Sequence, residues 1–245
     1  MPLAAVLVMI DVMFVWHAVK TGRCSPWCYI ILALPGVGAA AYILVELFPE
    51  WLNSFNGQKA QIRVGRALNP EKQYRALIDA LTIADTVANR EALAKECLTI
   101  EKFAEARTHF ETILRHPQGD NPMYEFGKAQ AEFGLGQFAA VIATLDALRA
   151  QWPHYQSTEA HMLYARALEE SSQPDAALAE YRALAEYHSG AEARVRMGLL
   201  LAEMGRQDEA RTAFAEVITV MARQPKFVRK VQAEWIALAE KALRA

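Results

Sequence analysis

The sequence predicts an all-α protein in which a two-helix transmembrane hairpin precedes a helical solenoid that ends in a capping helix. The 245 residues are 53% hydrophobic, but this apolar content is unevenly spread. Residues 2–19 and 27–48 are almost continuously apolar, whereas residues 50–245 are amphipathic and rich in Ala, Leu, Glu and Arg. The second region also contains four similar blocks, each about 34 residues long. Long apolar runs are typical of membrane spans, and repeated amphipathic helices are typical of solenoids.

The first apolar stretch, residues 2–19, predicts a helix of roughly 27 Å, because each helical residue adds about 1.5 Å. That length just reaches across a hydrocarbon core of about 30 Å. No Lys or Arg precedes the stretch, Asp11 lies in its middle and no small-residue cleavage pattern follows, which argues against a secretory signal peptide. Because a carboxylate is costly inside a membrane, we expect Asp11 to face the partner helix or His17, as a hydrogen-bonding group or in a proton relay.

The second apolar stretch, residues 27–48, is long enough to cross a membrane with some tilt. Trp27 and Trp51 lie at its two ends, where aromatic side chains anchor spans at the interface. Pro35, Gly36 and Gly38 are expected to bend this helix and to let the two helices approach closely. Cys24 and Cys28 lie near the loop, as small interfacial residues or as a redox pair.

These residues carry a resemblance to a known family. The pattern consists of a basic loop followed by aromatic, small and acidic positions, namely Lys20, Arg23, Trp27, Ile30, Ile31, Pro35, Gly38, Tyr42 and Glu46. It resembles the membrane hairpin that begins bacterial cardiolipin synthases of the phospholipase D superfamily, over about 40 residues. The resemblance implies an anchor in a bacterial envelope membrane. It does not imply the enzyme activity, because no His is followed two residues later by Lys.

Flanking charges bear on the orientation of this hairpin. Lys20 and Arg23 in the loop favour an external repeat domain, whereas Lys59, Arg63 and Arg66 after the second stretch favour a cytoplasmic one. The resemblance favours the cytoplasmic side over the periplasmic side. We therefore expect a two-pass protein of the bacterial inner (cytoplasmic) membrane, with a hairpin over 1–50, a linker over 51–70 and a repeat domain over 71–245.

The repeat domain is predicted from a recurring set of small and aromatic positions. In each block a small residue on the first helix is followed by Ala or Val on the second and by an aromatic residue or Leu four residues later. These are Ala94, Ala106 and Phe110; Ala129, Val141 and Leu145; Ala165, Ala177 and Tyr181; and Gly198, Ala210 and Phe214. The second-helix small positions are 35, 36 and 33 residues apart. This pattern resembles the tetratricopeptide repeat, with repeats over about 85–118, 121–153, 156–189 and 190–223.

Packing explains why these residue types recur. Small side chains are needed where two antiparallel helices cross, and the aromatic side chain fills the groove toward the next repeat. The pattern departs from the family at Val141, where Ala is usual, and at Glu101 and Ser172, where Gly usually turns the chain. Residues 71–84 are expected to cap the first repeat.

The last segment, residues 226–245, predicts one amphipathic capping helix that covers the core of the last repeat. Its apolar face would contain Phe227, Val228, Val231, Trp235, Leu238 and Ala242. The alternative is that Trp235 and its neighbours bind a partner.

Charge and motifs exclude several classes of function. The net charge is −2 and the basic residues are scattered, so we expect no nucleic-acid binding. Three cysteines are too few for a disulfide framework, and the six histidines show no metal-ligand spacing. No nucleophile elbow, phosphate-binding loop or dinucleotide-binding glycine pattern occurs. The sequence therefore predicts no enzyme activity, cofactor, metal or small-molecule substrate.

Function is then expected from a surface that binds a protein or peptide partner, in addition to a lipid bilayer bound through the hairpin. In the tetratricopeptide family the first helices line a concave groove. The matching positions here are Glu91, Lys95, Leu98, Phe126, Gln130, Phe133, Met162, Arg166, Glu169, Val195 and Leu199. Lys95 and Arg166 lack the Asn neighbours that complete a clamp for a C-terminal carboxylate, and Phe126 and Phe133 instead suggest an apolar anchor pocket.

The sequence leaves three functional hypotheses. The first is a membrane-anchored scaffold that gathers proteins at a bacterial envelope membrane. The second is an accessory or regulatory subunit for lipid or envelope biogenesis, which only the hairpin suggests. The third is an enzyme with an unrecognised site.

Overall fold

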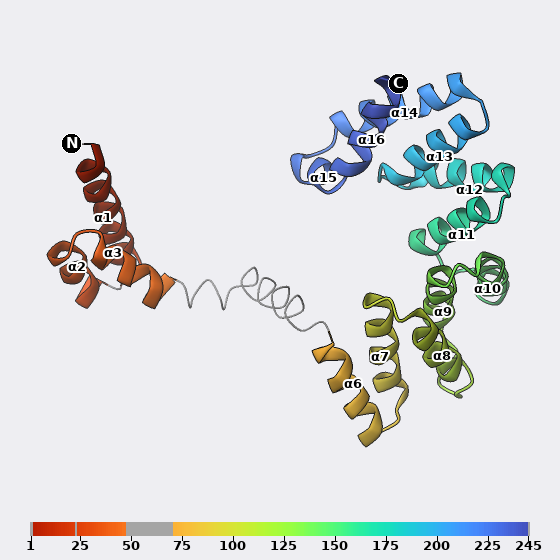
Figure 1. Cartoon of the computed structure of the whole chain (residues 1–245), viewed down its shortest axis with the longest axis horizontal. Helices are drawn as coiled ribbons and strands as arrows, with labels where there is room; N and C mark the ends of the chain where they lie inside the picture. The colour runs from red at the N-terminus through yellow and green to blue at the C-terminus, as the bar shows by residue number, and fades with distance from the viewer. Residues whose placement is uncertain (1, 23, 48–70, 245) are drawn as a thin grey trace. The chain divides into compact units, whose positions relative to one another are not determined.

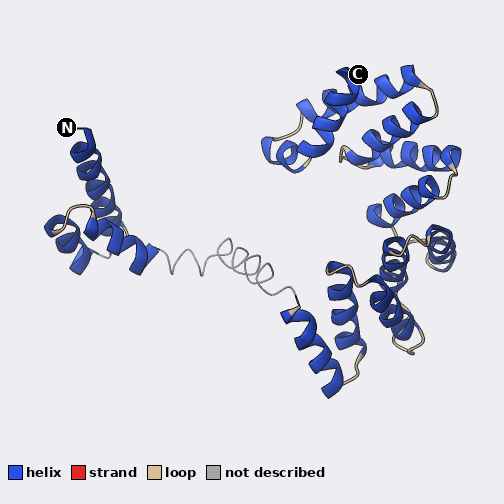
Figure 2. Ribbon diagram, in the orientation of Figure 1, coloured by secondary structure: helices blue, strands red, loops and turns tan. Residues whose placement is uncertain are grey.

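The computed structural model describes residues 2–22, 24–47 and 71–244, and within these ranges every regular element is a helix (Figure 2). The chain divides into two units, Met1–Lys72 and Gln73–Ala245. The predicted linker over 51–70 and the end of the second apolar stretch at Phe48 lie outside the described residues.

In residues 2–22 and 24–47, the N-terminal unit contains the helical segments α1 (Pro2–Lys20), α2 (Cys24–Ala33), α3 (Val37–Tyr42) and the π-helix η1 (Ile43–Leu47). The expectation of one continuous helix over 27–48 is wrong, because the chain turns between α2 and α3. Gly36 has a φ of 78° at this turn, a conformation that side chains disfavour. A Cβ atom at Gly38 would lie 2.5 Å from the carbonyl oxygen of Ile30, so α3 passes directly beside α2.

A buried carboxylate holds this turn. The backbone N–H of Gly36 donates to both carboxylate oxygens of Asp11, at 3.0 and 3.1 Å, and Asp11 is only 6% exposed. Asp11 therefore faces the second apolar stretch, as expected, but its partner is a backbone group. His17 instead lies 3.1 Å from the hydroxyl of Tyr42, which is fully buried. These contacts tie α1 to α3.

The prediction of a two-pass inner-membrane protein is contradicted. Within the described ranges, the structure offers no helix whose length and apolar character would let it traverse a bilayer. Pro35 and Gly36 divide the second stretch into α2 and α3, of 10 and 6 residues. At about 1.5 Å per residue these reach roughly 15 and 9 Å, against a hydrocarbon core of about 30 Å. The prediction that the repeat domain lies on the cytoplasmic side depended on these spans and is therefore not supported either.

The second unit is a stack of helices that follow one another back and forth along the chain (Figure 1). The helices are α6 (Lys72–Ile83), α7 (Val87–Thr99), α8 (Phe103–Leu114), α9 (Pro122–Gly134), α10 (Phe138–Gln151), α11 (Thr158–Glu170), α12 (Pro174–Tyr187), α13 (Glu192–Glu203), α14 (Gln207–Ala222), α15 (Lys226–Val231) and α16 (Ala233–Arg244). Each helix packs mainly on its neighbours in sequence. Such local packing is the mark of a solenoid.

The recurring small and aromatic residues form the core of this unit. All twelve positions are buried, and Ala94, Ala129, Ala165 and Ala177 have no exposed surface. The ring of Phe110 on α8 lies against Gly127 on α9, where an added Cβ would come within 2.4 Å of the ring. The aromatic side chain of this block therefore reaches the next repeat, as the sequence indicated.

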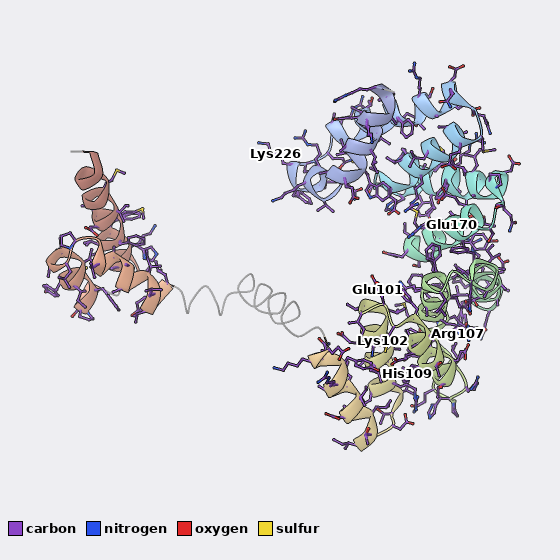
Figure 3. The ribbon with its side chains drawn as sticks, in the orientation of Figure 1. Glu101, Lys102, Arg107, His109, Glu170 and Lys226 are labelled. Carbon is purple, nitrogen blue, oxygen red and sulfur yellow. The ribbon has the colours of Figure 1, made fainter. Side chains whose placement is uncertain are left out.

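Equivalent turns connect the two helices of each repeat. Glu101, Gly136, Ser172 and Gly205 all have positive φ, at 61°, 70°, 57° and 77° (Glu101 is labelled in Figure 3). The next residue donates its N–H to the carbonyl five residues earlier, which closes the helix end. These bonds are Lys102 to Cys97 (2.8 Å), Gln137 to Glu132 (3.0 Å), Gln173 to Leu168 (3.0 Å) and Arg206 to Leu201 (2.9 Å). Glu101 and Ser172 thus adopt the glycine conformation despite their side chains.

The C-terminal segment is two helices rather than the single helix expected over 226–245. The helix is interrupted at Gln232, whose side-chain carbonyl accepts a 3.1 Å hydrogen bond from the N–H of Ala191. Only α16 caps the last repeat. Trp235 packs there, with the guanidinium of Arg196 over its ring at 5.2 Å. Phe227 and Val231 on α15 are 72% and 76% exposed, so they do not belong to the capping face.

The segment expected to cap the first repeat, residues 71–84, contains α6. Tyr74, Leu77 and Leu81 pack against the buried Leu93 and Cys97 of α7.

Replacing Ser172 with glycine is expected to stabilise the protein. A residue with a side chain costs about 1–2 kcal/mol in the left-handed conformation. Glycine avoids this cost but loses more conformational freedom on folding, which offsets about 0.5–1 kcal/mol of the gain. Ser172→Gly should therefore raise the free energy of unfolding by about 0.5–1 kcal/mol, measured by urea titration. The reverse change, Gly136→Ser, should lower it by a similar amount. Equal destabilisation by both variants would contradict this account of the turn.

Acidification is expected to weaken the fold through His109. Burial, followed by the charge of Arg90, lowers the pKa of His109 from 6.5. An Arg90 guanidinium nitrogen lies 3.4 Å from Nδ1 of the ring, which suits a neutral imidazole. The unfolded chain then binds the proton more readily, so stability falls as the pH drops below about 6.5. Thermal unfolding midpoints between pH 7.5 and 5.5 should fall less in His109→Gln than in the parent chain; identical pH dependence would refute this assignment.

Candidate peptide-binding groove

The predicted groove residues lie on the first helices of successive repeats, α7, α9, α11 and α13. On α7, Lys95 is exposed and forms a 2.5 Å ion pair with Glu91. Glu91 also accepts a 3.1 Å hydrogen bond from the hydroxyl of Tyr124 on α9. This polar chain joins the first two repeats along the groove side.

A cavity of about 260 Å³ lies between α9 and α11. Its lining consists of Phe126, Gln130, Thr158, Glu159, Met162, Leu163, Arg166, His188 and Glu192. Four of these were predicted as groove residues, namely Phe126, Gln130, Met162 and Arg166. The fold brings them together because residues one helical turn apart share a face, and α9 and α11 pack side by side.

The cavity has an apolar floor and a charged rim. Phe126, Met162 and Leu163 are 9%, 8% and 9% exposed, so their side chains form its buried part. Gln130 is exposed and Arg166 is half-buried. Across the described ranges Arg166 has no ion-pair partner, which leaves one cation beside an apolar depression.

Phe133 has a different place from the one expected. It does not line the cavity, but its ring lies under the guanidinium of Arg166 at 4.5 Å. The ring also packs edge-on against Phe138 at 5.3 Å. Phe133 therefore fixes Arg166 through a cation–π contact and is not itself an anchor pocket.

The other predicted residues do not line the cavity. The carboxylate of Glu169 accepts a 2.5 Å hydrogen bond from Tyr181, and burial, followed by this bond, raises the pKa of the Tyr181 hydroxyl. Leu199 on α13 is 38% exposed, whereas Val195 is buried and Leu98 packs into the core. Glu169 thus supports the packing of α11 on α12.

Sequence reasoning missed the residues that close the cavity from the next repeat. His188 follows α12 and Glu192 begins α13, and both were outside the first-helix face used to choose groove positions. Glu192 forms a 2.9 Å ion pair with Arg196, and Glu159 accepts a 3.1 Å hydrogen bond from Ser157. A search of the helix starts next to the groove would have found both acidic residues.

The described side chains offer no metal centre. Within 2–22, 24–47 and 71–244, no group of three or more His, Cys, Asp or Glu residues is placed to hold a metal ion. The cavity instead combines an apolar floor with a charge at its edge.

A sequence model of the tetratricopeptide repeat matches residues 91–155, 126–184 and 165–225, which together span more than half of the chain. The chain belongs to the tetratricopeptide repeat family. No curated protein matched this chain significantly. The comparisons also give no support to the resemblance with the hairpin of cardiolipin synthases.

Several solved structures share the fold. MamA 41-end from Desulfovibrio magneticus RS-1 is 15% identical and covers 69% of this chain and 95% of its own, with a TM-score of 0.57. YrrB, described as a tetratricopeptide protein with an unusual peptide-binding site, is 18% identical and covers 78% and 90%, with a TM-score of 0.55. TTC0263, a thermophilic tetratricopeptide protein in Thermus thermophilus, is 17% identical and covers 76% and 99%, with a TM-score of 0.52. At these identities the likeness establishes the fold alone.

Proposed function

We propose that this tetratricopeptide protein is an interaction module that binds a peptide segment of a partner protein in the groove along its first helices. An apolar side chain of the peptide enters the cavity between α9 and α11, and a neighbouring acidic residue pairs with Arg166. The observation that carries this proposal is the unpaired Arg166 beside the apolar floor of that cavity. The peptide-binding site named for YrrB supports it by analogy of fold.

The size of the cavity favours a peptide over a small-molecule substrate. Its volume of about 260 Å³ is below the roughly 300–1,000 Å³ typical of small-molecule sites. Such a depression takes one large side chain while the rest of the ligand lies along the surface. Recognition would then combine an anchor residue with polar contacts around it.

The geometry also favours a peptide with an acidic residue next to the apolar side chain that enters the cavity. A guanidinium held against an aromatic ring loses less conformational freedom when it binds a carboxylate. Phe133 provides that support for Arg166. The exposed amide of Gln130, which also lines the cavity, offers a donor and an acceptor to the peptide backbone.

The remaining predicted positions extend this proposal along the groove. Lys95, paired with Glu91, would contact one end of the peptide, and Leu199 and Glu169 would lie toward the other end. No observation in the structure favours the alternative of an accessory subunit for lipid or envelope biogenesis, which depended on the hairpin resemblance.

Reversing the charge of Arg166 is expected to weaken peptide binding. Peptides would be selected on the full chain from a random display library, labelled, and their affinities measured by fluorescence anisotropy. Arg166→Glu should weaken the selected peptides at least tenfold, equivalent to about 1.4 kcal/mol. Phe133→Ala should cause a smaller loss, because it only frees the guanidinium.

Arg211→Glu is the matched control. Arg211 is exposed on α14, outside the groove, and its replacement makes the same change in net charge. Its affinity should stay within twofold of the parent chain, and circular dichroism would verify that all variants remain folded. Peptides that bind the Arg166→Glu variant as tightly as the parent would rule out the proposed groove.

A further inference from the structure

The C-terminal cap carries a basic surface that the repeat fold does not use. Lys226, Arg229 and Lys230 lie on α15, and Arg223 precedes it (Lys226 is labelled in Figure 3). All four are exposed, and in the described part of the chain none has an ion-pair partner. A concentrated charge of one sign raises the rate and selectivity of association with a partner of the opposite sign.

A shallow, open groove lies between this basic helix and α16. The α15 side of the groove is formed by the three cations. The α16 side is a single helical stripe at positions i, i+3, i+4 and i+7, namely Ala233, Ile236, Ala237 and Glu240. The two sides together make a groove with a basic wall and an apolar floor.

The floor is suited to the approach of another helix. Ala233 and Ala237 are small and exposed, so a backbone can come close to α16 between them. Ile236 is half-buried because its other side packs on the core of the last repeat, so it gives a fixed apolar contact. Glu240 lies at the far end of the stripe in an exposed 3.5 Å ion pair with Arg244, a weak pair that a docked basic residue can replace. The stripe spans about 10 Å, or two helical turns.

We propose that the groove between α15 and α16 binds an acidic amphipathic helix of a partner protein. The apolar face of that helix lies on Ala233, Ile236 and Ala237, its carboxylates face the cations of α15, and a basic residue near one end pairs with Glu240. This arrangement is a helix laid in a groove, with the orientation set by the charges at the two ends. It is separate from the cavity between α9 and α11 and does not depend on the function proposed above.

The helical spacing of the floor and the adjoining charge select this occupant over an anionic bilayer. Ala233, Ile236 and Ala237 form a stripe one helix wide beside a row of cations, which matches the narrow apolar face and flanking carboxylates of an amphipathic helix. Phe227 and Val231, one turn apart on the neighbouring face of α15, extend the apolar area that the flank of a docked helix can cover. A solenoid end also offers the surface on which a further helix would stack.

The test uses the full chain and a designed, fluorescently labelled peptide. This peptide carries Leu at helical i, i+3, i+4 and i+7 spacing, Glu at the other positions and one terminal Arg. A scrambled peptide of the same composition has the same charge but no apolar face. In anisotropy titrations the amphipathic peptide should bind at least tenfold more tightly than the scrambled one, because only its apolar side chains meet the groove floor.

Two variants locate the binding. The double variant Arg229→Glu and Lys230→Glu should weaken binding at least tenfold, and Ala237→Trp should do the same by filling the floor without changing the charge. The control, Arg115→Glu with Arg211→Glu, makes the same charge change just after α8 and on α14 and should stay within twofold. Circular dichroism would verify that each variant remains folded.

Three results would overturn the proposal. The first is equal binding of the scrambled peptide, which would indicate charge attraction alone. The second is unchanged affinity in the groove variants. The third is binding of phosphatidylglycerol vesicles by a chain that does not bind the amphipathic peptide, which would assign the basic surface to a membrane.

Discussion

The close crossing of two helices at small side chains is the constraint on which the repeat unit depends. Residues such as Ala94 and Ala106 are fully buried, so the paired helices can approach without a bulky group between them. That approach forces short connections, which is why the turn positions adopt positive φ even where the residue is Glu101 or Ser172. It also aligns the first helices side by side, so that Phe126 and Met162 from separate repeats border one cavity.

The parts of the fold that were predictable are those encoded by local spacing. The small and aromatic positions recur about every 34 residues, so the helices, their turns and the buried faces could be inferred directly. The bend in the second stretch was indicated by Pro35, Gly36 and Gly38, but its complete interruption was not, because hydropathy measures the length of an apolar run and not its continuity. The bend at Gly36 depends on Asp11, 25 residues earlier, and the break at Gln232 depends on Ala191, 41 residues earlier. Single-helix patterns do not report such distant contacts.

The same distinction applies to the candidate groove. Phe126, Gln130, Met162 and Arg166 were predictable because they lie one helical turn apart on the same face of two first helices. Phe133 lies outside the cavity lining, and its contacts with Arg166 and Phe138 could not be predicted because they depend on how the next helices pack. His188 and Glu192 were missed because their place near the cavity is set by the path of a loop between repeats. A helix face follows from local sequence spacing, whereas the edge of a pocket depends on how the repeats pack on one another.

The turn residues alternate between glycine and residues with side chains, so conformational strain differs from one repeat to the next. Gly136 and Gly205 adopt positive φ without strain, whereas Glu101 and Ser172 do not, so the first and third repeats store more conformational strain than the second and fourth. In a solenoid such strain is not shared by the whole chain, because each unit contacts only its neighbours. The cavity between α9 and α11 joins a relaxed second repeat to a strained third repeat. If a peptide binds there as proposed, it would contact the strained third repeat and would stabilise that repeat against local unfolding.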